Sequence, residues 1–419
     1  MSATHVLATY DIATHLPPAE AAEILAGEQS TGTFVRVPGE SARLRERFGA
    51  RVIEVTELPD DGLPPLPGAA GPPSGATDVP HRARVRIAFP LHNFGPSLPN
   101  LLAAVAGNLF ELRELAAVRL VDLDLPPAFA RRYPGPAFGV AGTRRLTGRP
   151  DGTLIGTIVK PGVGLDLDAL RTLVRELALA GIDFVKDDEL TANPPHAPLR
   201  DRVAVVTEEL DKAARRTGRR TMYAFNITDD IDRLAAHHDL VRDAGGTCVM
   251  VCVQTVGPAG VAYLRRRSTL PIHGHRAMSG ALLRSPQIGL GPVVFQKLAR
   301  LVGVDQLHVG GVASKFYESD ADVAATVRAV RSPLFDGYET LPVLSSGQHP
   351  GLAHRTYRLL GTSDLLVLAG GGIHAHPDGP ADGVAAMRSA WHAAVAGESL
   401  DRRAARDRPL ARALERFGA

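Results

Sequence analysis

Residues Gly181–Leu190, GIDFVKDDEL, join a short apolar run to a cluster of charges and indicate both the fold and the site of this chain. The run IDFV has the length and composition of a buried strand. Because side chains alternate along a strand, Lys186 and Asp188 are expected on one face and Asp187 on the other. Glu189 stands where the strand gives way to a loop and can turn back beside them. A helix start or a solvated charged turn is the alternative interpretation.

Two carboxylates beside a lysine, at the end of a buried strand, provide the oxygen ligands that a hard cation such as Mg²⁺ prefers. A protonated lysine cannot be a metal ligand. A buried lysine can lose its proton, however, and the neutral amine can add carbon dioxide to form an anionic carbamate. A carbamate on Lys186, with Asp188 and Glu189, would supply three anionic ligands. The simpler alternative is a salt bridge between Lys186 and Asp188.

From about residue 150 onward, short apolar strands recur and a helical stretch follows each of them. Buried parallel strands with helical crossovers predict a (βα)8 (TIM) barrel. An open, doubly wound sheet is the alternative, but the repeats contain no clear switch point. The eight strands are predicted at residues 154–159, 182–187, 221–226, 247–253, 270–275, 306–311, 341–346 and 364–372.

The preceding residues mix strands and helices without strict alternation, which is typical of an α+β domain. The predicted organisation is therefore an N-terminal α+β domain over residues 1–140 and a barrel with its C-terminal tail over residues 141–419. The tail, from Ala396, is rich in arginine and predicts a terminal helix followed by a solvated end. Predicted strands cover 5–14, 30–37, 50–58, 84–91 and 116–126, predicted helices cover 19–29, 41–49 and 97–110, and residues 59–82 form a predicted loop.

Composition excludes several classes of protein. A net charge of +2 provides no electrostatic argument for nucleic acid or for an anionic membrane as a partner. The two cysteines, Cys248 and Cys252, lie in an apolar stretch and are expected to be buried rather than disulfide-bonded, which fits a reducing cytoplasm. We find neither an apolar run of the roughly 18 residues needed to span a membrane nor a signal peptide.

In a (βα)8 barrel the chemistry takes place at the carboxyl ends of the strands, and this chain places many polar residues there. Lys160 follows the first strand and can serve as an acid or a base. Glycine-rich turns after the last two strands can hold a phosphate with backbone N–H groups, and Arg276 with His308 can hold a second anion. Tight turns and core histidines are the alternatives. Other strand-end residues are Asn226, His273, His275, Lys315, Ser345, Gly347, Gly370 and Gly371.

The order of several motifs resembles the large subunit of ribulose-bisphosphate carboxylase (RuBisCO) from about residue 5 to residue 395. The pairing of a KPxxG motif with KDDE at this spacing is highly specific. The N-terminal stretches EQSTGTF and VAGNLF resemble active-site segments of the same family. The barrel motifs are GTIVKPGVGLD, GIDFVKDDE, YAFNIT, IHGHRAM, LHVGG with a following lysine, PVLSSG and AGGG.

The resemblance implies a role for each matching residue. Lys186 would be the carbamylated lysine, with Asp188 and Glu189 as the other Mg²⁺ ligands, and Lys160 would handle the enolisation proton. Lys315 matches a lysine on a mobile loop. Residues matching one phosphate site are His275, Arg276, His308 and Ser345, those matching the other are Gly347, Gly370 and Gly371, and those matching segments supplied by a partner subunit are Glu28, Thr33, Phe34 and Asn108. At least a homodimer is therefore implied.

Departures from the carboxylase pattern are concentrated where carbon dioxide would be handled. The second lysine of the carboxylases' KPK motif is Gly162 here, and the loop GGVASKFYES departs from their glycine-rich pattern. Further replacements are Ile158, Phe34, Ser279 and Ser346. The chain therefore resembles the RuBisCO-like proteins (form IV) more than the carboxylases.

The predicted function is a Mg²⁺-dependent enolisation of a phosphorylated keto-sugar or keto-acid, leading to isomerisation, tautomerisation or decarboxylation. The first alternative is the 2,3-diketo-5-methylthiopentyl-1-phosphate enolase of methionine salvage, although Asn108 stands where those enolases have a catalytic lysine. An authentic ribulose-1,5-bisphosphate carboxylase and a non-catalytic regulatory protein are the others. The retained Lys160, Lys186, Asp188 and Glu189 argue against a non-catalytic protein, because a silent scaffold has no need to keep these charges together.

Overall fold

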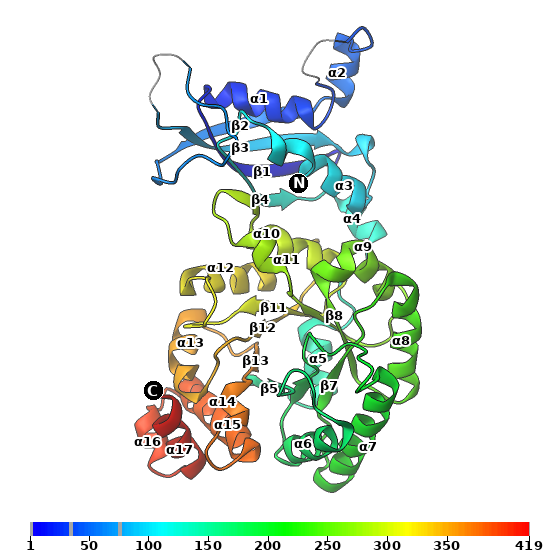
Figure 1. Ribbon diagram of the computed structural model, residues 1–419, viewed down its shortest axis with the longest axis vertical. Coiled ribbons are helices and arrows are strands. Elements are labelled where there is room, and N and C mark those ends of the chain that lie inside the picture. The colour runs from blue at the N-terminus through cyan, green and yellow to red at the C-terminus, as the bar shows by residue number, and fades with distance from the viewer. Residues whose placement is uncertain (1–2, 33–36, 74–77, 419) are drawn as a thin grey trace. The chain divides into compact units, whose positions relative to one another are not determined.

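The computed structural model describes residues 3–32, 37–73 and 78–418, which form two compact units (Figure 1). One unit contains Met1–Tyr133 and Met278–Leu298, and the other contains Pro134–Ala277 and Ala299–Ala419. Half of the strand predicted at 30–37, residues 33–36, lies outside the described residues.

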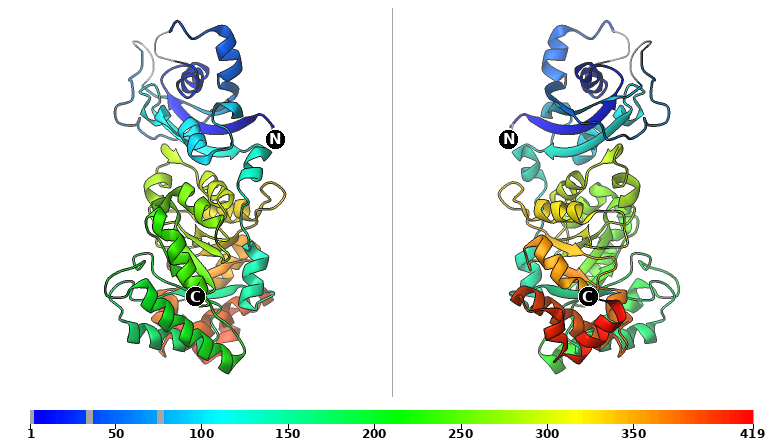
Figure 2. Two further views of the ribbon diagram at one scale, coloured as in Figure 1. Left: turned by 90° about the vertical axis from the view of Figure 1, so that its right-hand side faces the viewer. Right: turned by 90° about the vertical axis from the view of Figure 1, so that its left-hand side faces the viewer.

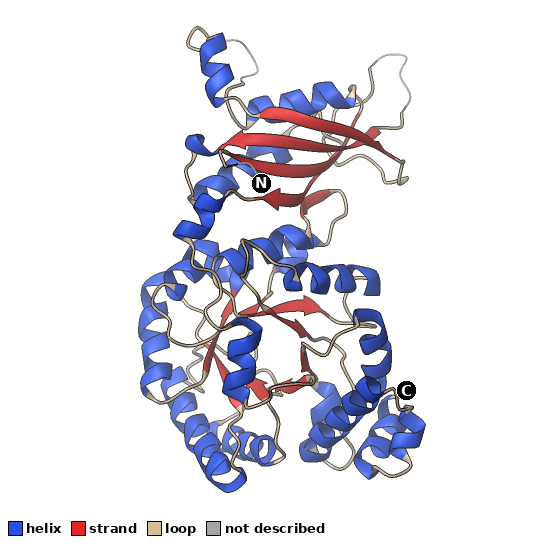
Figure 3. Ribbon diagram, turned by 180° about the vertical axis from the view of Figure 1, so that it is seen from behind, coloured by secondary structure: helices blue, strands red, loops and turns tan. Residues whose placement is uncertain are grey.

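The first unit is built on a five-stranded sheet with the order β10-β4-β1-β3-β2. Its strands are β1 (His5–Thr14), β2 (Arg51–Leu58), β3 (His81–Pro90), β4 (Ala117–Asp124) and β10 (Ile288–Leu290). All the pairs are antiparallel except β10 with β4. Alternate residues of β1 are buried, and α1 (Pro18–Glu28) packs on the sheet (Figure 3).

Short helices complete this unit. They are α2 (Ala42–Phe48), α3 (Leu98–Val105), α4 (Pro127–Arg132) and α10 (Ser279–Leu283), with 3₁₀ turns at Leu91–Asn93 and Asn108–Glu111. The helix predicted at 97–110 therefore ends at Val105, and β3 begins within the predicted loop 59–82. Strand β10 was not predicted, because three residues are too few to show a period.

The second unit contains a closed barrel of eight parallel strands, which confirms the (βα)8 prediction and excludes the open sheet. The strands follow one another around the barrel in chain order. They are β5 (Leu154–Ile158), β6 (Phe184–Lys186), β7 (Met222–Asn226), β8 (Cys248–Cys252), β9 (Ile272–His275), β11 (Gln306–Gly310), β12 (Leu341–Leu344) and β13 (Leu366–Leu368).

Helices lie around the outside of this barrel (Figure 1). The helices that follow the strands are α6 (Leu167–Leu179), α7 (Leu199–Thr217), α8 (Ile231–Asp243), α9 (Val253–Arg265), α12 (Asp320–Arg331), α13 (Ala353–Leu360), α14 (Gly371–His374) and α15 (Pro380–Ala396). Helix α5 (Gly139–Thr147) precedes the first strand, and a 3₁₀ turn covers Pro350–Leu352. Helix α11 (Pro292–Leu301) begins in the first unit and continues into the barrel unit before β11.

Apolar side chains from β5, β6, β7, β8, β12 and β13 fill the barrel interior. Cys248 is one of them, which confirms that it behaves as a small buried hydrophobe, and both cysteines are free. Burying one such side chain contributes roughly 1.5–3 kcal/mol, so this layer is a rigid base for the strand ends above it. It consists of Leu154, Phe184, Met222, Ala224, Cys248, Met250, Leu341, Val343, Leu366 and Leu368.

The C-terminal tail differs from its prediction. It forms two helices, α16 (Leu400–Ala404) and α17 (Arg408–Phe417), which pack beside α15 (Figure 2). Leu410 and Ala413 of α17 are fully buried, so this helix is part of the barrel unit, whereas Glu415, Arg416 and Gly418 at its end are exposed. Among the helices of residues 3–32, 37–73 and 78–418, none has the length and apolar character needed to cross a membrane.

Candidate active site

The charged cluster predicted from the sequence lies at the carboxyl ends of the barrel strands, which we call the barrel mouth. Lys186 is the last residue of β6 and is fully buried. Its Nζ donates to the carbonyl oxygen of Asp187 at 2.8 Å and to Oε2 of Glu189 at 3.3 Å. Burial lowers the pKa of Lys186, although Glu189 and Asp188 oppose this effect. The balance brings this lysine closer to its neutral form than an exposed lysine would be.

Asp188 forms its ion pair with a different lysine. Nζ of Lys160, in the loop after β5, lies 2.6 Å from Oδ2 of Asp188, so the simple Lys186–Asp188 salt bridge is not the arrangement observed. Asp188 is buried, whereas the Lys160 side chain is 44% exposed. Lys160 is therefore held at the mouth by a buried carboxylate while its amine remains open to a ligand.

Asp187 points away from this cluster, as strand alternation predicts. Its carboxylate accepts hydrogen bonds from Arg202 at 3.0 Å, from the Tyr223 hydroxyl at 2.6 Å and from the Asn226 backbone at 2.9 Å. The Asn226 side chain in turn donates to the carbonyl oxygens of Asp188 at 3.1 Å and Glu189 at 3.2 Å. These bonds hold the turn that carries the two mouth carboxylates.

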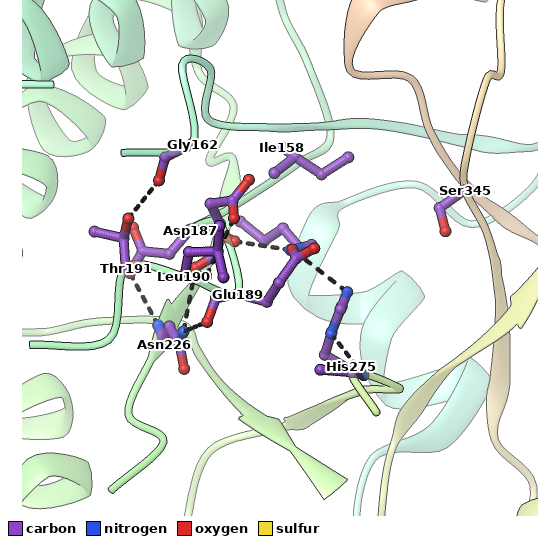
Figure 4. A network of polar contacts seen from close by, with 12 residues as sticks. Ile158, Gly162, Asp187, Glu189, Leu190, Thr191, Asn226, His275 and Ser345 are labelled. Atoms are coloured by element: carbon purple, nitrogen blue, oxygen red, sulfur yellow. Dashed lines mark hydrogen bonds and ion pairs between the residues drawn. The ribbon is translucent and has the colours of Figure 1, made fainter. Parts of the chain in front are cut away.

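Gly162 lies against this turn. A Cβ atom at residue 162 would lie 2.6 Å from Oδ2 of Asp188, closer than such atoms approach without a shift. The Thr191 hydroxyl donates to the carbonyl oxygen of Gly162 at 2.6 Å and joins the two loops (Figure 4). Any side chain at this position would compete with Asp188 for the same space.

His275, at the end of β9, faces the cluster from the other side. Its Nδ1 accepts a hydrogen bond from the Ala277 backbone at 3.1 Å, so the ring proton is on Nε2 in the neutral form. That Nε2 lies 3.5 Å from Oε2 of Glu189 (Figure 4). Burial and the positive charges of Lys186, Arg276 and Lys160 lower the pKa of His275 well below its usual range. Glu189, by contrast, has a lowered pKa: burial opposes the shift, but the charge of Lys186, the hydrogen bonds to the carboxylate and the charge of Lys160 together outweigh it.

A chain of polar side chains crosses the barrel below the mouth. Oε1 of Gln306 lies 3.0 Å from Nδ1 of His273, and Nε2 of His273 lies 2.9 Å from Nε2 of His308. Nδ1 of His308 then lies 3.0 Å from the Ser345 hydroxyl. Burial lowers the pKa of both histidines well below the usual range, so both rings are neutral.

The direction of each hydrogen bond in this chain follows from its first member. A carbonyl oxygen can only accept, so His273 donates from Nδ1 and accepts at Nε2. His308 must then donate from Nε2 and accept at Nδ1, and Ser345 donates its hydroxyl proton to it. Gln306 itself is oriented by a bond from its Nε2 to the Thr143 hydroxyl at 3.1 Å. One amide therefore sets the tautomers of two histidines.

Arg276, which the sequence analysis assigned to an anion site, is already paired. Its two terminal nitrogens contact the two carboxylate oxygens of Glu318, one of them at 2.6 Å. Glu318 comes from the loop between β11 and α12. In the same loop Lys315 is exposed, with its Nζ 5.5 Å from the centre of the Phe316 ring.

The glycine-rich turns lie beside the two exposed lysines. A Cβ atom at Gly370 would lie 3.8 Å from Cε of Lys160, and one at Gly347 would lie 3.7 Å from the backbone nitrogen of Lys315. Gly347 has a φ of +73°, a conformation that side chains other than glycine rarely adopt. Gly371 is exposed beside Gly370. The turns that follow β12 and β13 are thus brought together with Lys160 and Lys315.

Two of the predicted site residues lie in the described part of the N-terminal unit. Glu28 is the last residue of α1 and Asn108 the first of a 3₁₀ turn, and both are exposed within the described chain. Thr33 and Phe34 lie outside the described residues. The sequence did not point to two further residues, Glu318 and Gln306, because each acts through a side chain that is distant in the chain.

The residues at the mouth fit magnesium. Asp188 and Glu189 provide oxygen donors, which suit a hard cation. Lys186 is fully buried beside them, and burial lowers its pKa, which is the condition for a neutral amine that can take up carbon dioxide. A carbamate on Lys186 with these two carboxylates would therefore hold the ion.

Comparisons with known proteins cover nearly the whole chain. Residues 139–417 match the model of the ribulose bisphosphate carboxylase large chain catalytic domain, and residues 1–129 match that of its N-terminal domain. A 3-oxo-isoapionate-4-phosphate transcarboxylase/hydrolase of Xanthobacter autotrophicus is 49% identical over 98% of both chains. A 3-oxo-isoapionate-4-phosphate decarboxylase of Rhizobium etli is 42% identical over 98% of both chains. The crystal structure of a rubisco-like protein from Burkholderia fungorum is similar with a TM-score of 0.90 and 42% identity, over 99% of this chain and all of that one.

Proposed function

This chain belongs to the ribulose bisphosphate carboxylase large-chain family, and on that premise we propose that it removes the carboxyl group of a branched 3-oxo sugar acid phosphate of the 3-oxo-isoapionate-4-phosphate kind. The observation that carries the proposal is the cluster of Lys160, Lys186, Asp188 and Glu189 at the barrel mouth. It combines oxygen ligands for a cation with an amine that can move a proton.

The proposed reaction needs both a bound cation and a group that moves a proton. In a 3-oxo acid the carbonyl group is β to the carboxylate, so breaking the bond between the carboxyl carbon and its neighbour leaves the electron pair as an enolate. That enolate must be stabilised and then protonated on carbon. When bound by Asp188, Glu189 and a carbamate on Lys186, Mg²⁺ would stabilise negative charge on the substrate oxygens.

Lys160 is the residue that we propose as the proton donor. Its amine is held by Oδ2 of Asp188 at 2.6 Å and remains partly exposed at the mouth. The ammonium form can deliver a proton to the enolate carbon, and the neutral amine then recovers a proton from solvent. Because Asp188 is buried, the position of the donor is set by a rigid element and not by a mobile loop.

The neighbouring residues are proposed to orient the substrate and to bind its phosphate group. His275 presents its Nε2–H toward Glu189 and can also donate to a substrate oxygen. The turns with Gly347, Gly370 and Gly371 expose backbone near Lys315 and Lys160 and are proposed to take the phosphate. We propose a homodimer as the smallest active unit, since Glu28, Thr33, Phe34 and Asn108 match segments that the family supplies from a partner subunit.

The other functions considered are less well supported. An authentic carboxylase would need the second lysine of KPK, but residue 162 is glycine, and a side chain there would compete with Asp188 for space. The methionine-salvage enolase would need a lysine where Asn108 stands. A non-catalytic protein would not need a buried lysine at the mouth, which costs stability.

The test is to incubate the purified protein with 3-oxo-isoapionate 4-phosphate carrying ¹³C in its carboxyl group and to follow the label by NMR. We expect Mg²⁺-dependent loss of the label from the substrate, with incorporation of deuterium at the adjacent carbon in D₂O. A signal of dissolved carbon dioxide or bicarbonate identifies decarboxylation, whereas a new labelled carboxylate identifies transfer or hydrolytic cleavage. Turnover that persists both after chelation of Mg²⁺ and in Lys186→Met would overturn the proposal.

A further inference from the structure

We propose that Glu318 makes this site selective for ligands with one phosphate group over ligands with two, by occupying the guanidinium group that would hold the second phosphate. The inference rests on the proposed function. It specifies, in addition, the charge at the end of the ligand that lies beside Arg276. That end is uncharged, so it carries a hydroxyl or carbonyl group.

The geometry of the Arg276–Glu318 ion pair supports this inference. Both terminal nitrogens of Arg276 contact both carboxylate oxygens of Glu318. This is the two-pronged arrangement that a phosphate would also use, so the two anions compete for the same hydrogen-bond donors. The side chains are only 14% and 7% exposed, which means that breaking the pair would leave two charges with little access to water.

The structure also holds Glu318 in place. The next residue, Ser319, caps α12, and its side chain and that of Asp322 exchange hydrogen bonds with the backbone. The loop is closed at its base by a bond from the Ala313 backbone to Asp320 at 2.7 Å, and Asp320 contacts Arg355 of α13 at 2.6 Å. Glu318 is therefore positioned by a helix start and a closed loop.

The other residues expected at this anion site already have partners within the protein. Nε2 of His275 lies 3.5 Å from Oε2 of Glu189. His308 and Ser345 bond to each other at 3.0 Å, and the second ring nitrogen of His308 is bonded to His273. A phosphate dianion placed here would face the Glu318 carboxylate, which already pairs with Arg276. A hydroxyl or carbonyl group meets no such repulsion.

The experiment compares ligands that differ by one phosphate. Ribulose 1-phosphate, ribulose 5-phosphate and ribulose 1,5-bisphosphate are titrated calorimetrically into the full-length protein with Mg²⁺ and bicarbonate. In the wild-type protein we expect the bisphosphate Kd to lie within about threefold of the tighter monophosphate Kd. In Glu318→Gln, which keeps the side-chain shape but removes the charge, we expect the bisphosphate to bind at least about tenfold more tightly than in the wild type, the value of one charge-assisted hydrogen bond.

The matched control is Glu208→Gln on α7. It makes the same change from carboxylate to amide in another arginine pair, with Arg171 at 2.7 Å on the outer helices. Its preference between the ligands should equal that of the wild type. If Glu318→Gln fails to fold, the double variant Arg276→Met/Glu318→Met replaces the whole buried pair by apolar side chains, which proteins often tolerate. It should keep its monophosphate affinity within about fivefold.

Two results would overturn the inference: a wild-type protein that prefers the bisphosphate by tenfold or more, or a double variant that loses a hundredfold in monophosphate affinity. If either appears while the labelled keto acid still loses its carboxyl group, the inference alone is wrong. If no sugar phosphate binds to any variant and the labelled substrate is not consumed, the proposed function fails together with it.

Discussion

Two clusters of charged side chains in the barrel unit have similar composition and opposite properties. On the outer helices α6 and α7, the Glu209 carboxylate accepts hydrogen bonds from Arg175 at 2.7 Å and from Arg171 and Lys212 at 3.0 Å each. The side-chain hydrogen bond from Arg175 is the main cause that lowers the pKa of Glu209 to about 2, and the pKa of Lys212 is raised. Every group in this helix cluster is shifted toward its charged form.

At the barrel mouth the same kinds of group are arranged differently. Lys186 is fully buried, and burial lowers its pKa in spite of the adjacent carboxylates. The helix cluster has solvent around its lysine and arginines, whereas protein surrounds the Lys186 side chain at the mouth. The helix cluster therefore stabilises the fold, whereas the mouth cluster holds a buried lysine with a lowered pKa at a cost in stability, which is typical of functional sites.

The strongest test of this contrast is to remove the lysine from each cluster. Lys186→Met should lower the rate of carboxyl loss by at least about a thousandfold, because the reaction loses a proposed metal ligand. Its melting temperature should be equal to or higher than that of the wild type, since a buried amine is replaced by an apolar chain. Lys212→Met is the matched control and should retain full activity. Equal activity of the two variants, measured with the labelled substrate, would contradict the contrast.

Lys160→Met tests the exposed member of the mouth cluster. We expect a loss of about a hundredfold to a thousandfold in kcat, the usual contribution of a positioned acid or base. Deuterium incorporation from D₂O should fall in parallel with the remaining turnover, because the proton donor has been removed. A variant that keeps the wild-type rate would remove Lys160 from the proposed mechanism while leaving the metal ligands in place.

The polar chain below the mouth is expected to have a smaller effect. Gln306→Leu removes the carbonyl group that sets the tautomer of His273 and, through it, that of His308. We expect a loss of roughly tenfold in kcat/KM, comparable to one hydrogen bond. The specific signature is a change in the ¹⁵N shifts of the histidine rings, which report the tautomer directly. Unchanged ¹⁵N shifts would show that Gln306 does not determine the tautomers.

The smallest expected effect comes from the helix cluster. Glu209→Gln should lower the melting temperature by about 1–3 °C at pH 7 and leave the activity unchanged. The pKa of Glu209 is lower in the folded chain than in the unfolded one, so its contribution is complete above about pH 4.5 and decreases as the pH falls toward 2. The difference between variant and wild type should therefore stay constant above about pH 5 and shrink between about pH 4.5 and pH 2 in thermal denaturation. A difference that grows on acidification would contradict the assigned pKa shift.

Much of the fold was predictable because barrel strands are buried on both sides. Each appears as a short apolar run, and the polar residue that ends the run lies at the mouth whatever the details of packing. This is why Lys186, Asp188 and Glu189 were identified from one stretch of ten residues. Strand β10 and the packing of α17 were missed, because a three-residue strand and an arginine-rich helix do not show the partners that bury them.

The architecture and the residue types at the strand ends follow from the sequence alone, since they depend on local patterns of apolar and polar residues. Which charged side chains form ion pairs, in contrast, depends on the tertiary structure. Lys160 pairs with Asp188 across 28 positions of the chain, and Arg276 pairs with Glu318 across 42. Such pairs leave no periodic trace in the sequence, because the distance between two loops is set by barrel closure and not by their separation along the chain.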